Sequence, residues 1–141
     1  MSKIDIHKAA FLEEAYELLT VLETSLLELE ESPDNMELIG TIFRALHTIK
    51  GSGSMFGFDR IAAFTHEVET AFDLVRNGEV TVTKELIDLT LSSRDHIKKM
   101  LDSPDEHDDS AGKKILQSLK RLLPGKHQDK NTEVKSGKTD P

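Results

Sequence analysis

His47 and Lys50 are the residues whose types and spacing are best suited to chemistry, and they lie within a strongly apolar run of sequence. Residues at positions i, i+3, i+4 and i+7 share one face of a helix. One face of the helix predicted here therefore carries His47, Lys50, Gly51 and Ser54. The opposite face is apolar and carries Ile42, Phe43, Leu46, Ile49 and Phe56. We therefore expect His47 to face water.

Two glycines, Gly51 and Gly53, follow the lysine directly. A glycine in the interior of a helix costs about 1 kcal/mol relative to alanine. This is a destabilising choice beside an exposed histidine. We interpret Gly51 as a provision for steric access, since a partner's active site could close over His47 when no side chain stands at that position.

A second pair of polar residues, His66 and Glu69, lies at i and i+3 on a helix predicted for residues 60–76. A tight turn at 57–59 joins this helix to the one that carries His47, so the two helices are expected to be antiparallel neighbours. His47 lies about ten residues before the turn and Glu69 about eleven after it. With a rise of about 1.5 Å per residue, both reach the same height in the hairpin. We expect the Glu69 carboxylate to meet His47.

This pairing would prepare His47 for nucleophilic chemistry. A carboxylate that accepts a hydrogen bond from Nδ1–H fixes the tautomer and leaves Nε2 as a neutral nucleophile. An unperturbed histidine has a pKa of about 6.5, so most of it is neutral near pH 7. Lys50 could then offset the charge of a phosphoryl group on Nε2. The implied chemistry is phosphoryl transfer through a phosphohistidine, in which the protein positions the group and supports it electrostatically.

The elements that must position these side chains are all predicted to be helices. Apolar residues recur at intervals of three and four, which predicts helices at 4–31, 36–56, 60–76, 84–101 and 109–123. We expect an all-α fold, an antiparallel four-helix bundle with an additional C-terminal fifth helix on one end or side.

Short polar segments separate the predicted helices. Ser32-Pro33-Asp34-Asn35 ends the first helix, because proline disfavours the helical state of the residue before it. Asp59 and Thr83 are the predicted N-caps of the third and fourth helices. Asn77-Gly78 ends the third helix through a residue able to adopt a positive φ. Residues 80–82 are predicted to be a short extended link without a strand partner.

Composition divides the chain into a domain at 1–124 and a tail at 125–141. Val134 is the one aliphatic residue between positions 126 and 141. Such a segment buries too little apolar surface to offset the entropy of ordering it. We predict a disordered linker or tail, and its abrupt end suggests a chain cut from a longer protein.

Composition also excludes several classes of function. A net charge of −8 argues against binding to nucleic acid or anionic membranes. The chain has no cysteine, and therefore no disulfide framework or thiol nucleophile. It has neither a signal peptide nor an apolar run long enough to span a bilayer, so a cytoplasmic location is the default. The motifs of phosphate loops, dinucleotide sites, serine hydrolases and zinc proteases are also missing, and catalysis by this chain alone is poorly supported.

The sequence around His47 is similar to a known signature. Phe43-Arg44-Ala45-Leu46-His47-Thr48-Ile49-Lys50-Gly51-Ser52, followed by Gly57-Phe58, resembles the motif of histidine phosphotransfer (HPt) domains. More narrowly, it resembles the N-terminal phosphoacceptor domain of CheA-type chemotaxis histidine kinases. The agreement continues through Thr65-His66-Glu67-Val68-Glu69, Arg76-Asn77-Gly78-Glu79 and Ile87-Asp88-Leu89.

The resemblance covers about residues 11–101, with one departure within the motif. Leu46 stands where alanine is common in the family. Because Leu46 lies on the face predicted to be buried, we expect an adjustment of packing and no loss of function.

The resemblance implies a role for each residue of the site. His47 is the phosphoacceptor, Glu69 is the carboxylate that orients it, and Lys50 and His66 complete the surroundings. The domain binds no cofactor, because ATP and Mg are bound by a separate kinase domain of the same chain or of a dimer partner. The phosphate then passes to an aspartate of a response-regulator receiver domain. The parent protein would be a histidine protein kinase of a two-component system.

Three alternatives remain at the level of sequence. The chain could be a stand-alone phosphorelay carrier, or a helical interaction module that is not phosphorylated and binds a partner helix in a groove. The third alternative is a metal site formed by His47, His66 and Glu69, which are ligand types that suit zinc. Lys50 beside such a site would repel a cation.

The remaining histidines have no evident companions in the sequence and are predicted to be solvated; they are His7, His96, His107 and His127. No apolar stripe remains uncovered in the predicted bundle. We therefore expect the isolated domain to be monomeric.

Overall fold

The fold was analysed in a computed structural model, which describes residues 3–106 and 108–124. Over those residues the chain forms five helices and no strand: α1 (Lys3–Glu31), α2 (Met36–Met55), α3 (Asp59–Arg76), α4 (Lys84–Asp102) and α5 (Ser110–Arg121). The predicted all-α class with five helices is confirmed. The tail predicted at 125–141 lies outside the described residues.

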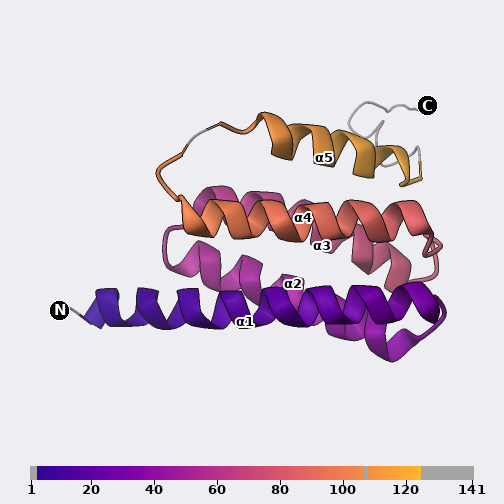
Figure 1. The fold of residues 1–141 in the computed structure, drawn as a ribbon, viewed down its shortest axis with the longest axis horizontal. Coiled ribbons are helices and arrows are strands. Elements are labelled where there is room, and N and C mark those ends of the chain that lie inside the picture. Colours follow the sequence, from indigo (N-terminus) through magenta and orange to yellow (C-terminus); the bar gives the residue numbers. More distant parts are fainter. Residues whose placement is uncertain (1–2, 107, 125–141) are drawn as a thin grey trace, which may run out of the picture.

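Helices α1 to α4 form a four-helix bundle, in which each helix runs antiparallel to the one before it (Figure 1). Helix α1 packs against α2 and α4, and α3 packs against the same two helices, so the four close around a common core. Helix α5 lies along α3 and α4 on the side of the bundle away from α1 (Figure 1). The fifth helix therefore packs on one side of the bundle, which was one of the two placements predicted.

The core consists of one apolar face from each bundle helix. One apolar stripe of α3 is buried and comprises Ile61, Phe64, Val68, Phe72 and Val75. The fully buried side chains of the other bundle helices include Leu19, Leu22, Leu26, Ile42, Ile49, Leu86 and Ile97. Burial of each such side chain contributes about 1.5–3 kcal/mol, so this core is what holds the helices in place.

Side chains cap the beginnings of two helices. The Asn35 side chain accepts a hydrogen bond from the Leu38 amide at 3.1 Å at the start of α2. Thr83 caps α4 in the same way, as predicted, by accepting from the Leu86 amide at 3.1 Å. Each bond satisfies a backbone N–H that has no partner within its helix.

The predicted capping role of Asp59 is wrong, because Asp59 is already the first residue of α3 and Phe58 occupies the cap position without a side-chain hydrogen bond. Backbone groups close this turn instead. The Phe58 amide donates to the Gly53 carbonyl at 2.8 Å, and Gly57 adopts φ = 85°, a conformation that glycine tolerates. The chain therefore enters α3 one residue earlier than expected.

The prediction that His96 is solvated is also wrong. His96 is only 8% exposed, and its ring lies edge-on to Phe64 with 4.7 Å between the ring centroids. Gly112 of α5 covers the ring so closely that a Cβ at that position would lie 2.7 Å from Nε2. The polar face of α4 that carries His96 is the face on which α5 packs. His7 is exposed as predicted, and His107 and His127 lie outside the described residues.

Burial lowers the pKa of His96, and the positive charges of Lys99 and Arg60 lower it further, while Asp109 opposes them. The imidazole is therefore held in its neutral form within the contact between α4 and α5. In the described part of the chain, every helix is too short or too polar to cross a membrane.

Candidate functional site

The antiparallel hairpin of α2 and α3 brings His47 and Glu69 together. Nδ1 of His47 lies 2.6 Å from Oε2 of Glu69, at the common height that the hairpin geometry predicts. The two side chains differ strongly in exposure, since 61% of the histidine side chain is exposed and only 8% of the glutamate. The carboxylate thus sits at the edge of the core and holds one ring nitrogen, while the rest of the imidazole projects into solvent.

Lys50 and His66 complete a cluster around the same carboxylate. Nζ of Lys50 lies 2.9 Å from Oε1 of Glu69. Nδ1 of His66 lies 3.4 Å from the same oxygen. The four candidate residues predicted from the sequence therefore form one cluster, in which the other three converge on Glu69.

Lys50 has a partner that the sequence analysis did not predict. Its ammonium group forms an ion pair with Glu69, and its expected role of offsetting the charge of a phosphoryl group on Nε2 stays a prediction. The physical reason is the burial of Glu69, because a buried carboxylate without a positive partner is costly. Lys50 is 26% exposed, so its charge still contributes to the field at the surface beside His47.

The charge state of Glu69 decides the tautomer of His47. Burial alone would raise the pKa of the Glu69 carboxyl, but hydrogen bonds from Lys50 and His47, together with their charges, hold the pKa below its ordinary value of 4.5. At neutral pH Glu69 is therefore an anion that can only accept hydrogen bonds. In a neutral His47 ring, Nδ1 must then carry the proton, which leaves the Nε2 lone pair free.

Phe43 is a neighbour of His47 that the sequence analysis placed on the opposite, apolar strip. The structure places its half-buried ring nearly parallel to the imidazole, with 6.0 Å between the centroids and an interplanar angle of 14°. The guanidinium carbon of Arg76 lies 4.0 Å from the centroid of the Phe43 ring. The i, i+4 spacing of Phe43 and His47 in the sequence could have indicated that these two rings lie side by side.

The surface beside His47 is open at Gly51. This glycine is exposed, and a Cβ built on it would meet no atom within 4 Å outside its own turn of helix. Leu46, the departure from the family motif, is 1% exposed and belongs to the core, as expected. The structure is consistent with our interpretation of Gly51 as a means of access for a partner.

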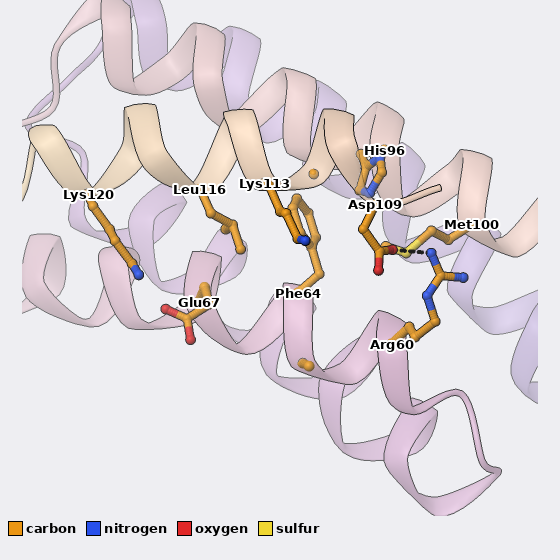
Figure 2. A pocket seen from close by; sticks show the side chains of 11 residues that line it. Arg60, Phe64, Glu67, His96, Met100, Asp109, Lys113, Leu116 and Lys120 are labelled. Atoms are coloured by element: carbon orange, nitrogen blue, oxygen red, sulfur yellow. Dashed lines mark hydrogen bonds and ion pairs between the residues drawn. The ribbon is translucent and has the colours of Figure 1, made fainter. Parts of the chain in front are cut away.

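Three cavities formed by the described residues lie away from this cluster. The first is a pocket of about 320 Å³ between α3, α4 and α5, and its walls include Arg60, Phe64, His96 and Asp109 (Figure 2). The other two lie at the turn before α3 and beside the link between α3 and α4, and none of the three is lined by His47 or Glu69. His47 thus stands on an open surface, which suits a partner protein that closes over it better than a small ligand that needs an enclosing pocket.

Metal binding finds no support in the arrangement of ligands. Across residues 3–106 and 108–124, no group of three or more His, Asp or Glu side chains could hold a metal ion. The cluster instead pairs one carboxylate with a lysine and two histidines, so the ammonium group of Lys50 already lies 2.9 Å from Oε1.

Comparison with known proteins identifies the class to which this fold and site belong. The family model described as "Hpt domain" matches residues 8–107, and the chain belongs to this family of histidine phosphotransfer domains. The chemotaxis protein CheA of Borreliella burgdorferi is 46% identical over 91 residues, which are 64% of this chain and 10% of that protein. The chain spans about a tenth to a fifth of the length of the curated relatives it matches first.

Solved structures of similar domains share the fold. The CheA phosphotransferase domain from Thermotoga maritima is 38% identical with a TM-score of 0.68, and the match covers 75% of this chain and all of that one. The phosphorylated P1 domain of CheA3 from R. sphaeroides, solved in complex with CheY6, is 24% identical with a TM-score of 0.73, over 83% of this chain and 94% of that one. At 24% identity, the similarity to the CheA3 domain establishes a shared fold and nothing about function.

Proposed function

We propose that this chain is the phosphoacceptor domain of a chemotaxis-type two-component histidine kinase and that His47 is the residue phosphorylated. One observation carries the proposal. The hydrogen bond of 2.6 Å between His47 Nδ1 and the buried, ionised Glu69 leaves Nε2 as an exposed nucleophile on a rigid helix. This is the arrangement that a phosphohistidine intermediate requires.

The reaction follows from the tautomer that Glu69 imposes. The Nε2 lone pair attacks the γ-phosphorus of ATP held on a separate kinase domain, a new N–P bond forms, and the bond from phosphorus to the ADP oxygen breaks. Nδ1 keeps its proton, so the phosphorylated ring is cationic, and the Glu69 carboxylate 2.6 Å away stabilises that charge. Attack by an aspartate carboxylate of a receiver domain then breaks the N–P bond and returns the ring to its neutral form.

Lys50 and His66 support this cycle through Glu69. Lys50 keeps the carboxylate ionised by an ion pair of 2.9 Å, and its positive charge beside His47 offsets the negative charge of the arriving phosphoryl group. The His66 side chain is 58% exposed, and its Nδ1 lies 3.4 Å from Oε1 of Glu69 on the solvent side of the cluster. ATP and its Mg belong to the separate kinase domain, and the residues of this chain supply the acceptor and its orientation.

The partners that fit the site are proteins that bring their own active sites to His47. The kinase domain, in the same or a partner chain, delivers the phosphate, and a response-regulator receiver domain removes it. The open surface at Gly51 favours both encounters. The solved complex of the R. sphaeroides CheA3 domain with CheY6 shows a domain of this fold bound to another protein, as we propose for the receiver domain. We place the reaction in the cytoplasm, where two-component kinases meet ATP and their receivers.

The alternative of a stand-alone phosphorelay carrier uses the same chemistry at His47 and differs only in the donor. The named relatives are CheA proteins, which favours the kinase. A helical interaction module without phosphorylation would need no buried carboxylate held by a lysine and two histidines.

The proposal is tested by incubating the chain with ATP and the kinase core of a CheA-type protein that lacks its own phosphoacceptor domain. We expect acid-labile, base-stable phosphate on the wild type and none on His47→Gln. His7→Gln is the matched control, because His7 is an exposed histidine on α1 outside the cluster, and it should label like the wild type. Adding receiver domains should then remove the label. Phosphate that persists in His47→Gln would sink the proposal.

A further inference from the structure

The hydrogen bond to Glu69 fixes only one atom of the His47 ring. A side chain that is 61% exposed and held at Nδ1 alone can still tilt about that bond, which would move Nε2 away from an incoming phosphorus atom. The structure supplies a second restraint in Phe43, one turn earlier on α2. Its ring lies 6.0 Å from the imidazole centroid at an interplanar angle of 14°, within the range of offset stacking.

Arg76 holds Phe43 from the neighbouring helix. Its guanidinium carbon lies 4.0 Å from the centroid of the Phe43 ring, well within the range of a cation–π contact. The same guanidinium donates a hydrogen bond of 2.8 Å to Asp73, which steadies it. Arg76 is the last residue of α3, and Phe43 belongs to α2, so the contact links the two helices that make the site.

This contact also accounts for a segment to which no function has yet been assigned. The segment Arg76-Asn77-Gly78-Glu79 lies seven residues or more beyond Glu69 and contributes no group to the cluster around that carboxylate. Gly78, with φ = 80°, ends α3 at this point. The end of α3 therefore leaves the Arg76 side chain over the Phe43 ring.

We propose that Phe43, held by Arg76, is a positioning residue for His47, and that it sets the plane of the imidazole so that Nε2 points outward to the phosphoryl donor. The inference rests on the proposed function and deepens it. Phe43 lies stacked beside the imidazole and carries no group that could take part in phosphoryl transfer, so its effect reaches the reaction only through His47. A misplacement of about 1 Å can cost on the order of a hundredfold in rate, so a restraint of this kind has a measurable effect.

The test compares Phe43→Leu, which removes the ring, with Phe43→Tyr, which keeps it. Phosphorylation is measured with phosphoramidate, which needs no kinase, and label remaining in His47→Gln is subtracted. We expect Phe43→Leu to slow labelling of His47 about fivefold to twentyfold and Phe43→Tyr to stay within about twofold of wild type. Arg76→Gln should slow it about twofold to fivefold. Arg44→Gln is the matched control, because Arg44 is an exposed arginine on α2 adjacent to Phe43, and it should have no effect.

NMR relaxation of the His47 ring carbons supplies a readout that a merely structural role would not move. Glu69 sets the tautomer in every variant, so the nitrogen shifts of the Nδ1–H form should stay the same, whereas the ring should be rigid in the wild type and in Phe43→Tyr and more mobile in Phe43→Leu. A folded Phe43→Leu variant with wild-type labelling and an equally rigid ring would overturn the proposal.

Two further outcomes remain interpretable. If Phe43→Leu fails to fold, Arg76→Gln decides the question, because Arg76 is 45% exposed, and an unchanged rate in that variant overturns the proposal. If the wild type itself acquires no phosphate on His47, the proposed function fails. The ring relaxation measurements then still decide whether Phe43 positions the imidazole.

Discussion

His47 and Glu69 combine opposite environments within a single hydrogen bond. The histidine projects into solvent with 61% of its side chain exposed, and the glutamate is held at 8%. Burial prevents the carboxylate from exchanging its partners for water, and exposure lets a partner reach Nε2. One residue provides the nucleophile, and the other provides its orientation.

The importance of the carboxylate is tested by Glu69→Gln. The amide oxygen can still accept a hydrogen bond, but it carries no charge to stabilise the phosphorylated ring, and it leaves Lys50 without its ion pair. We expect phosphorylation of His47 to slow about tenfold to a hundredfold. Glu67→Gln removes a neighbouring carboxylate that is exposed on the same helix and should behave as wild type. Equal rates in the two variants would contradict the role assigned to Glu69.

Gly51→Ala should affect the stability of the domain and the access of a partner protein to His47 in opposite directions. A Cβ at Gly51 meets open space, so replacing a helical glycine with alanine should stabilise the domain by about 0.5–1 kcal/mol. The added methyl group should slow phosphorylation by the kinase core several-fold and leave phosphorylation by phosphoramidate unchanged, because the small donor does not cover that surface.

Gly40→Ala is the matched control for access, since Gly40 lies in the same helix and its Cβ would meet only the flexible end of Arg44 at 3.2 Å. It should gain stability without losing transfer. Urea unfolding and the two labelling reactions give the measurements. Wild-type transfer from the kinase core in Gly51→Ala would show that the glycine does not serve access.

At the scale of the elements, the hairpin of α2 and α3 sets the geometry of the site. The backbone bond from Phe58 to Gly53 and the positive φ of Gly57 fix how the two helices meet. From that turn onward, the regular rise of two helices is enough to bring His47 level with Glu69. Phe64 and Phe72 of α3 are buried in the core, which helps to hold that helix against its neighbours.

The contact between α4 and α5 should make stability depend on pH through His96. Burial lowers the pKa of His96, so below about pH 6.5 the unfolded chain takes up a proton that the folded chain refuses. Stability should therefore be greatest above pH 6.5 and fall as the pH drops toward 5. His96→Leu should remove this decline, as measured by urea unfolding at pH 7 and pH 5.

The effect of His96 on stability falls between pH 7 and pH 5, whereas the effect of Glu69 falls at lower pH. The pKa of Glu69 is held below 4.5, so its contribution to stability is present above that value and is lost as the pH falls through the lowered pKa. A decline between pH 7 and pH 5 that persists unchanged in His96→Leu would show that another group is responsible.

At the scale of the whole molecule, the core and the reactive surface are separate. Helix α5 packs on α3 and α4, and its Leu119 is 2% exposed. Leu119→Ala should lower the free energy of unfolding by about 2–4 kcal/mol through loss of apolar burial and the cavity it leaves. Phosphorylation of His47 should stay within about twofold of wild type where the variant is folded. A larger loss of transfer in the folded state would mean that α5 is coupled to the site.

Regular spacing made most of the fold predictable from the sequence. Apolar periodicity gave five helices, whose ends lie within two residues of the predicted positions. The meeting of His47 with Glu69 also followed from spacing, because both residues lie on regular helices joined by a short turn.

Features that depend on how helices pack were not predictable in this way. Burial of His96 required knowing which face of α4 receives α5, and the contact of Arg76 with Phe43 required knowing how the end of α3 lies against α2. The pairing of Lys50 with Glu69 depended on the burial of that carboxylate. In each case the deciding quantity was a contact between elements, which periodicity within one element does not contain.

The most direct test of the account is to locate the phosphate within the imidazole of His47. The nitrogen-15-labelled chain is phosphorylated by a CheA-type kinase core with ATP, and the phosphorus–nitrogen coupling is measured by NMR. We predict phosphate on Nε2 of His47, with Nδ1 still protonated toward Glu69, because the bond of 2.6 Å occupies Nδ1. Phosphate on Nδ1, or on another histidine while His47 stays unmodified, would contradict the account.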